Sequence, residues 1–125
     1  TNEEGARQLA GLLAAAGYTS SIIDIRRTAG ILHLKSGVVA LDDQRLVAID
    51  ALAGNAAFGG YDVIHVSEGE EYAANCVRVN RHVLVAAGFP KLQKALVARG
   101  YDLVPLEMSE FRKMDGGLSC LSLRF

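Results

Sequence analysis

An internal repeat is the sequence feature that most constrains how this chain can fold. Residues 60–66 (GYDVIHV) match residues 100–106 (GYDLVPL) at a separation of 40 positions, and a Gly-Tyr pair at residues 17–18 precedes the first segment by 43. A period near 40 residues indicates repeated modules, each of which buries one face against its neighbours. The 125 residues have room for about two and a half modules.

Each module combines predicted helix and strand. Helical patterns precede the three Gly-Tyr pairs at residues 3–16, 51–57 and 91–99, and apolar segments follow them at residues 31–41, 74–86 and 117–125. The Gly-Tyr segments themselves contain the β-branched and aromatic residues typical of strands, as do residues 21–25 and 45–49. We therefore predict an α/β fold in which residues 1–125 form part of a single domain.

Local patterns predict where several elements begin and end. The first helix begins at Thr1 or Asn2, with Glu4 in the position of a capping box, and Gly17 ends it. An Asn-Arg pair at residues 80–81 separates two apolar runs and predicts the tight turn of a hairpin. Pro90 suits the first turn of a helix, where its missing N–H costs no hydrogen bond.

Composition excludes several classes of function. Thirteen basic and fourteen acidic residues are scattered without long runs, so no field would attract nucleic acid or an anionic membrane. Apolar runs are shorter than the roughly 18 residues of a membrane span, and we expect a soluble, cytoplasmic protein. Two cysteines and three histidines lack the short spacings of zinc sites, and no phosphate-binding loop is present. We expect no metal and no cofactor.

Cys120 is the first candidate for chemistry. It follows an Asp-Gly-Gly sequence at residues 115–117, and glycines let the backbone approach a ligand closely. The thiol is therefore expected at the mouth of a cleft. The alternative is a buried, unreactive thiol, because free cysteine usually packs as a small apolar residue. Cys76 could compete for the role, but residues 73–75 before it have the pattern of a tightly packed strand entry.

His33 is the second candidate. It lies between Leu32 and Leu34 in a predicted strand, so its ring points away from both leucines. If the leucines face the core, the imidazole faces a cleft; the alternative is a surface or hydrogen-bonded strand histidine. His65 and His82 are weaker candidates of the same kind.

The repeat places His33, Cys76 and Cys120 at comparable positions in successive modules. Tyr18 precedes His33 by 15 residues, as Tyr61 precedes Cys76, so both positions lie near the start of the segment that follows a Gly-Tyr pair. Cys120 lies at a comparable position in the last segment. Pseudo-symmetry would gather these positions around one axis. A nucleophilic thiol needs a nearby cation or base such as a histidine, because its ordinary pKa near 8.5 leaves it mostly protonated at neutral pH.

Four segments carry a resemblance to a known family. They are TNEEGARQ at residues 1–8, LHLKSG at residues 32–37, YAANC at residues 72–76 and MDGGLSCLSLRF at residues 114–125. In this order they resemble the C-terminal half of bacterial dimethylarginine dimethylaminohydrolases. The resemblance covers essentially the whole chain.

The resemblance implies a fold and a reaction. The fold is the pentein-type α/β propeller, five ββαβ modules around a pseudo-fivefold axis, shared with arginine deiminase and the amidinotransferases. In the reaction, Cys120 attacks the guanidinium carbon of Nω-methylated arginine, and His33 serves as general acid and then as general base. Citrulline and methylamine or dimethylamine are the implied products. The resemblance also implies that Met114, Asp115 and Ser119 line the substrate site.

The resemblance further implies that other parts of the site are missing. The family carries an arginine directly before the Thr-Asn motif, and its guanidinium-binding acidic residues belong to the N-terminal half. We therefore expect this chain to be a C-terminal fragment that needs the N-terminal half for full activity, and that associates with that half or forms a homo-oligomer. Two alternatives remain open: an arginine deiminase-like guanidine hydrolase of the same fold, and an inactive fragment or assembly module.

Overall fold

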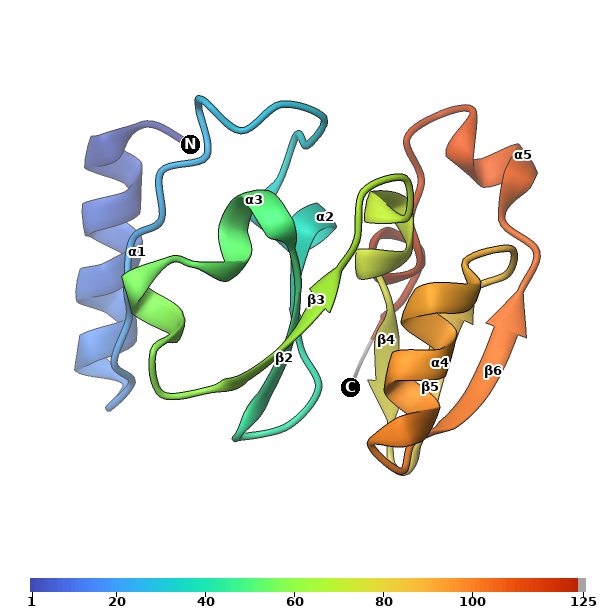
Figure 1. Ribbon diagram of the computed structural model, residues 1–125. Helices are drawn as coiled ribbons and strands as arrows, with labels where there is room; N and C mark the ends of the chain where they lie inside the picture. The colour runs from blue at the N-terminus through green and yellow to red at the C-terminus, as the bar shows by residue number, and fades with distance from the viewer. Residues whose placement is uncertain (124–125) are drawn as a thin grey trace.

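Two copies of one sheet topology make up the centre of the protein. The computed structural model describes residues 1–123, and its elements are shown in Figure 1. One sheet contains β1 (Val38–Ala40), β2 (Arg45–Ile49) and β3 (Asp62–Val66), in that order. The second contains β4 (Val77–Val79), β5 (His82–Ala86) and β6 (Asp102–Leu106), also in order. In each sheet the first two strands are antiparallel and the last two are parallel.

Helices connect the parallel strands, so each copy is a ββαβ module. In the first module the connection contains α3 (Asp50–Ala53) and the 3-10 helix η1 (Ala56–Phe58); in the second it is α4 (Pro90–Ala98), with Pro90 at its first position. The predicted hairpin turn is also confirmed, because Asn80 adopts a positive φ of 55° between β4 and β5. The predicted α/β class is therefore confirmed, and so is the order of helix and Gly-Tyr strand in the last two repeats.

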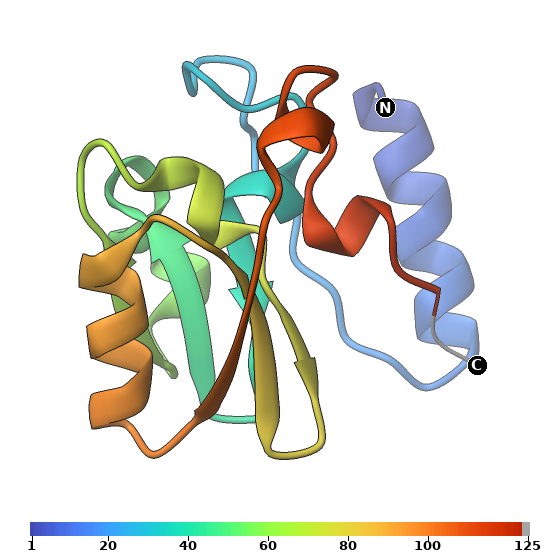
Figure 2. The same cartoon turned by 90° about the vertical axis from the view of Figure 1, so that its right-hand side faces the viewer.

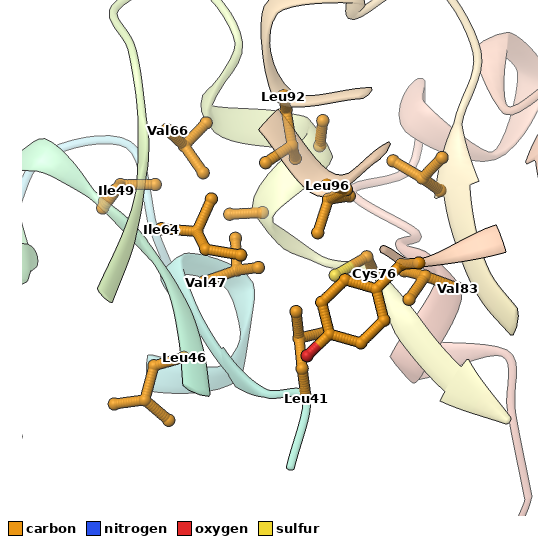
Figure 3. Packing of buried hydrophobic residues seen from close by; sticks show 14 of the residues in the cluster. Leu41, Leu46, Val47, Ile49, Ile64, Val66, Cys76, Val83, Leu92 and Leu96 are labelled. Carbon is orange, nitrogen blue, oxygen red and sulfur yellow. The ribbon is translucent and has the colours of Figure 1, made fainter. Parts of the chain in front are cut away.

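One hydrophobic core runs through both modules. Figure 3 shows side chains of the first sheet, such as Val47 and Ile64, facing Val83 of the second sheet and Leu96 of α4. All four are almost completely buried. Because neither sheet is covered on this face without the other, the two modules stabilise each other.

A polar cluster joins the two modules beside this core. The Tyr101 hydroxyl, from the second module, donates a hydrogen bond of 2.6 Å to Asp42 in the β1–β2 turn. This bond is the main reason why the pKa of Asp42 is lowered. The Arg45 and Arg78 guanidiniums lie 5.8 Å and 5.6 Å from the centre of the Tyr101 ring.

Glu70 connects the end of the first module to α4. Its buried carboxylate accepts hydrogen bonds from the backbone N–H groups of Lys91 (3.0 Å) and Leu92 (2.8 Å), in the first turn of the helix. Two otherwise unpaired N–H groups are satisfied in this way, at the end of the helix that favours negative charge.

We expect Glu70→Ala to lower the free energy of unfolding by about 2–3 kcal/mol, because it leaves buried N–H groups without an acceptor. Urea unfolding of the complete protein measures the loss as a lower midpoint at an unchanged slope. Glu70→Gln keeps one acceptor oxygen and serves as the matched control, with a smaller loss. Equal midpoints for Glu70→Ala and the unsubstituted protein would contradict this role.

The N-terminal helix lies outside the two modules. α1 (Glu3–Ala15) begins after Asn2, whose side chain accepts from the Gly5 N–H, and Gly17 follows it with a φ of 83°. The predicted helix is therefore confirmed, but Glu4 does not complete a capping box and instead accepts from Gln8 at 3.2 Å. Figures 1 and 2 show α1 at the periphery in both views, and none of its residues is buried.

The strand predictions before β1 are wrong. Residues 21–25 form no strand; Ile23 and Ile25 pack against the core, but no described strand lies beside them to pair. Residues 31–34 are not a strand either, because the chain turns into the short helix α2 (Leu34–Gly37). A Cβ at Gly37 would lie 3.0 Å from the Ile49 side chain, so a larger residue there would have to displace that side chain.

The apolar segment predicted at residues 117–125 contains no strand within the described residues. After β6 the chain forms α5 (Ser109–Arg112) and then the 3-10 helix η3 (Leu118–Cys120). A preceding 3-10 helix, η2 (Glu71–Ala74), lies between the modules. Arg124 and Phe125, the end of the resemblance motif, lie outside the described residues.

Candidate active site

A cavity of about 740 Å³ is lined mainly by three separate parts of the chain, with Ile49 at the end of β2 as a further lining residue. The first is the loop and helix start around His33, the second is η2 with the residue after it, and the third is the segment from α5 to η3. The lining residues are Ala29, Gly30, Ile31, Leu32, His33, Ser36, Ile49, Glu71, Tyr72, Asn75, Arg112, Met114, Asp115, Gly117 and Cys120.

Cys120 meets this cavity with an exposed side chain. A backbone hydrogen bond from Gly117 lowers the pKa of its thiol, and the Asn75 amide and the positive charge of Lys35 act in the same direction. The Asn75 Nδ2 atom lies 3.7 Å from the sulfur. Each of these groups favours the thiolate, which is the nucleophilic form of cysteine.

Cys76 has the opposite environment. Figure 3 shows its sulfur among aliphatic side chains of the core, and the residue is completely buried. Burial raises the pKa of the Cys76 thiol to about 12, so this thiol stays protonated at neutral pH. Of the two cysteines, only Cys120 has both access to the cavity and a lowered pKa.

His33 lines the same cavity, although the predicted reason for its orientation is wrong. It does not belong to a strand and instead directly precedes α2, with extended backbone angles (φ −134°, ψ 146°). Leu32, expected in the core, is 73% exposed. The imidazole and the Cys120 thiol therefore border one space, from segments 87 positions apart. His65 and His82 do not line the cavity.

The other predicted site residues occupy different positions around Cys120. Met114 and Asp115 line the cavity, and Asp115 adopts a positive φ of 56°, which asparagine and aspartate tolerate better than most residues. Ser119 does not line it. Its backbone N–H donates to the Asn75 Oδ1 atom at 2.9 Å, and its buried hydroxyl oxygen has no hydrogen-bond partner among residues 1–123.

Several lining residues were not predicted from the sequence. Glu71 lines the cavity and its carboxylate accepts the Gly69 N–H at 3.1 Å, while the Tyr72 hydroxyl donates a 2.6 Å hydrogen bond to the Gly116 carbonyl, which holds the segment before Cys120. The Arg112 guanidinium lies 5.0 Å from the centre of the Tyr72 ring. The YAANC segment contains Tyr72 and Asn75, but nothing in its pattern indicates contacts 44 residues away.

Metal-binding clusters and membrane-spanning helices are both absent from residues 1–123. No cluster of three or more histidine, cysteine or acidic side chains is arranged to hold a metal ion. No helix in this part of the chain has the length and apolar character that crossing a membrane requires.

Comparison with known proteins gives a consistent result. No family model matches the chain. An N(G),N(G)-dimethylarginine dimethylaminohydrolase from Pseudomonas aeruginosa is 38% identical over 125 residues, which is all of this chain and 48% of that protein. A second dimethylarginine dimethylaminohydrolase, from Streptomyces coelicolor, is 29% identical over 99% of this chain and 46% of its own length. The chain thus spans about half the length of the curated relatives it matches.

The fold comparison agrees. A solved structure of the Pseudomonas aeruginosa enzyme, a cysteine-to-serine mutant complexed with citrulline, superposes on this chain with a TM-score of 0.91. The match covers all of this chain and 48% of that structure. An amidinotransferase from Microseira wollei, 17% identical, shares the fold with a TM-score of 0.82. The pentein-type propeller prediction is confirmed, with only part of the module set present. By sequence and by fold, the chain is homologous over its full length to the dimethylarginine dimethylaminohydrolases.

Proposed function

We propose that this chain carries the nucleophile and the general acid/base of a dimethylargininase, which hydrolyses Nω-methylated arginine to citrulline and dimethylamine or methylamine. One observation carries the proposal: Cys120, with its lowered thiol pKa, and His33 border a single cavity. A nucleophile and a proton-transfer group at one cavity are what substitution at a guanidinium carbon requires.

In the proposed first half-reaction, the Cys120 thiolate adds to the guanidinium carbon. The C–N bond to the methylated nitrogen then breaks, and His33, as the imidazolium, gives its proton to the departing amine. An S-alkylthiouronium remains on the sulfur. In the second half-reaction the neutral His33 takes a proton from water, which adds to the same carbon. The C–S bond breaks, and citrulline and the thiolate are released.

Recognition of the substrate is proposed to use the acidic residues and carbonyls of the cavity. A guanidinium is a planar cation with several N–H donors, and it is best bound by carboxylates and carbonyl oxygens in its plane. Asp115 and Glu71 carry carboxylates and line the cavity, and Met114 lines it as well. Ser119 does not line the cavity, and its proposed contribution to the site comes from its place in the chain directly before Cys120.

We propose that residues outside this chain complete the site. They would come from a segment that corresponds to the unmatched half of the relatives, or from a second copy of this chain. The support is the half-length match and the exposed apolar side chains Leu9, Leu12, Tyr18 and Ile22 on α1 and the following loop. A cytoplasmic location is part of the same proposal, because a thiolate nucleophile stays reduced there; both cysteines are free.

The products released by the complete protein test this function. Incubation with asymmetric dimethylarginine should yield citrulline and dimethylamine in equal amounts, measured by chromatography of the amine and a colorimetric citrulline assay. Ammonia from unmethylated arginine, with no dimethylamine, would instead indicate the arginine deiminase-like alternative. Absence of turnover with both substrates would favour an inactive assembly module.

A further inference from the structure

Asn75 is a buried polar side chain placed between η2 and the segment that carries Cys120. The residue is only 5% exposed. Its Oδ1 atom accepts the Ser119 N–H at 2.9 Å, and its Nδ2 atom points to the Cys120 sulfur at 3.7 Å. A buried amide is costly unless its polar atoms are paired, so these two contacts explain how this side chain is tolerated.

Gly117 shows how closely Asn75 is fitted to this segment. A Cβ added at Gly117 would lie 2.1 Å from the Asn75 Nδ2 atom and 2.5 Å from its Cγ atom, far inside van der Waals contact. The glycine therefore leaves the space that the amide occupies.

The role of Asn75 differs from that of a simple loop anchor. Tyr72 already anchors the same segment, through its hydroxyl bond to the Gly116 carbonyl. Asn75 adds a donor directed at the reacting atom itself. A thiolate accepts such a bond more strongly than a thiol, because hydrogen bonds to the charged form favour that form.

We propose that Asn75 is a positioning residue for the nucleophile: its carbonyl oxygen fixes the backbone at Ser119, and its amide N–H group holds and stabilises the Cys120 thiolate. This inference rests on the proposed role of Cys120 as the nucleophile. It assigns the asparagine of the YAANC segment a task that neither the repeat nor the comparisons indicate.

Alkylation by iodoacetamide tests the proposal without any substrate. In the complete protein with Cys76→Ala, the alkylation rate as a function of pH reports the pKa of Cys120. We expect Asn75→Ala to move the midpoint up by about one pH unit and to slow alkylation at pH 7 about five- to tenfold. Asn75→Asp keeps an acceptor for the Ser119 N–H but replaces the donor, so its midpoint should rise at least as far.

Tyr101→Phe provides the matched control. It also removes one hydrogen bond between the modules, but Tyr101 does not line the cavity. Its midpoint should stay within about 0.2 pH unit of the unsubstituted protein, so a shift confined to the Asn75 variants separates a local effect on the sulfur from general destabilisation.

An unchanged midpoint in folded Asn75→Ala protein would overturn the proposal, and if that variant does not fold, an unchanged midpoint in Asn75→Asp would do so. Failure of the proposed function gives a different result. The unsubstituted protein would then release no dimethylamine, while the midpoints of the Asn75 variants would still shift.

Discussion

Cys120→Ser is expected to lower kcat for dimethylarginine hydrolysis by at least about a thousand-fold in the complete protein. A serine hydroxyl is almost fully protonated at neutral pH, whereas the environment of Cys120 lowers the pKa of the thiol through Gly117, Asn75 and Lys35. Serine is also a poorer leaving group when water releases the covalent intermediate. Citrulline formation over several hours measures the residual rate.

Cys76→Ala is the matched control, because it removes the other thiol of the chain. Cys76 lies in the core and does not line the cavity. Its replacement should preserve kcat within about twofold and lower the free energy of unfolding by about 1 kcal/mol, since a small void replaces the sulfur. If Cys120→Ser kept substantial turnover while Cys76→Ala lost it, the assignment of the nucleophile would be reversed.

His33→Ala is expected to lower kcat by about a hundred- to ten-thousand-fold, because no other group would deliver the proton to the departing amine or take one from water. The thiol itself remains, so iodoacetamide should still alkylate Cys120. Steady-state kinetics gives the first effect. Intact mass after rapid quenching shows whether a substrate adduct on the protein accumulates when the second half-reaction is slow.

His65→Ala controls for loss of an imidazole elsewhere. The His65 ring is exposed, lies 3.1 Å from Asp50 and does not line the cavity. Its variant should retain kcat within about twofold. Turnover of His33→Ala at the rate of this control would exclude His33 from the proposed mechanism.

The order of helix and Gly-Tyr strand in the last two repeats was predictable because local residues mark where the elements begin and end. The hairpin turn at Asn80 and the start of α4 at Pro90 are set by residues within a few positions, and the Gly-Tyr strands β3 and β6 follow a repeated apolar pattern. Gly17 likewise ended α1 as expected. In all these elements, the apolar pattern and the turn residues agree with the final structure.

The errors fall where distant contacts decide the backbone. Residues 21–25 have strand composition, but a strand also requires a neighbouring edge, which composition does not specify. Residues 31–34 have the same composition, yet they belong to neither sheet, and the chain enters the short helix α2 at Leu34. The segment around Leu118 forms a 3-10 helix, and its Ser119 N–H donates to Asn75, which lies 44 positions earlier.

The candidate site was predictable only in part for the same reason. Glycines before Cys120 indicated an accessible thiol, and the structure places that thiol at the cavity with His33. The direction of the His33 ring was derived from a strand that does not exist. Asn75, Glu71 and Lys35 could not be found, because their importance comes from distances across the fold and not from spacing along the chain.

The shared core has a consequence for how the protein loses its structure. Leu96 and Val83 of one module pack with Ile64 and Val47 of the other, so neither half of the repeat can melt while the other stays intact. Hydrogen exchange should therefore protect β2 and β5 to the same depth, with a single opening energy for both. The two modules are therefore expected to unfold as one cooperative unit, although they come from two separate sequence repeats.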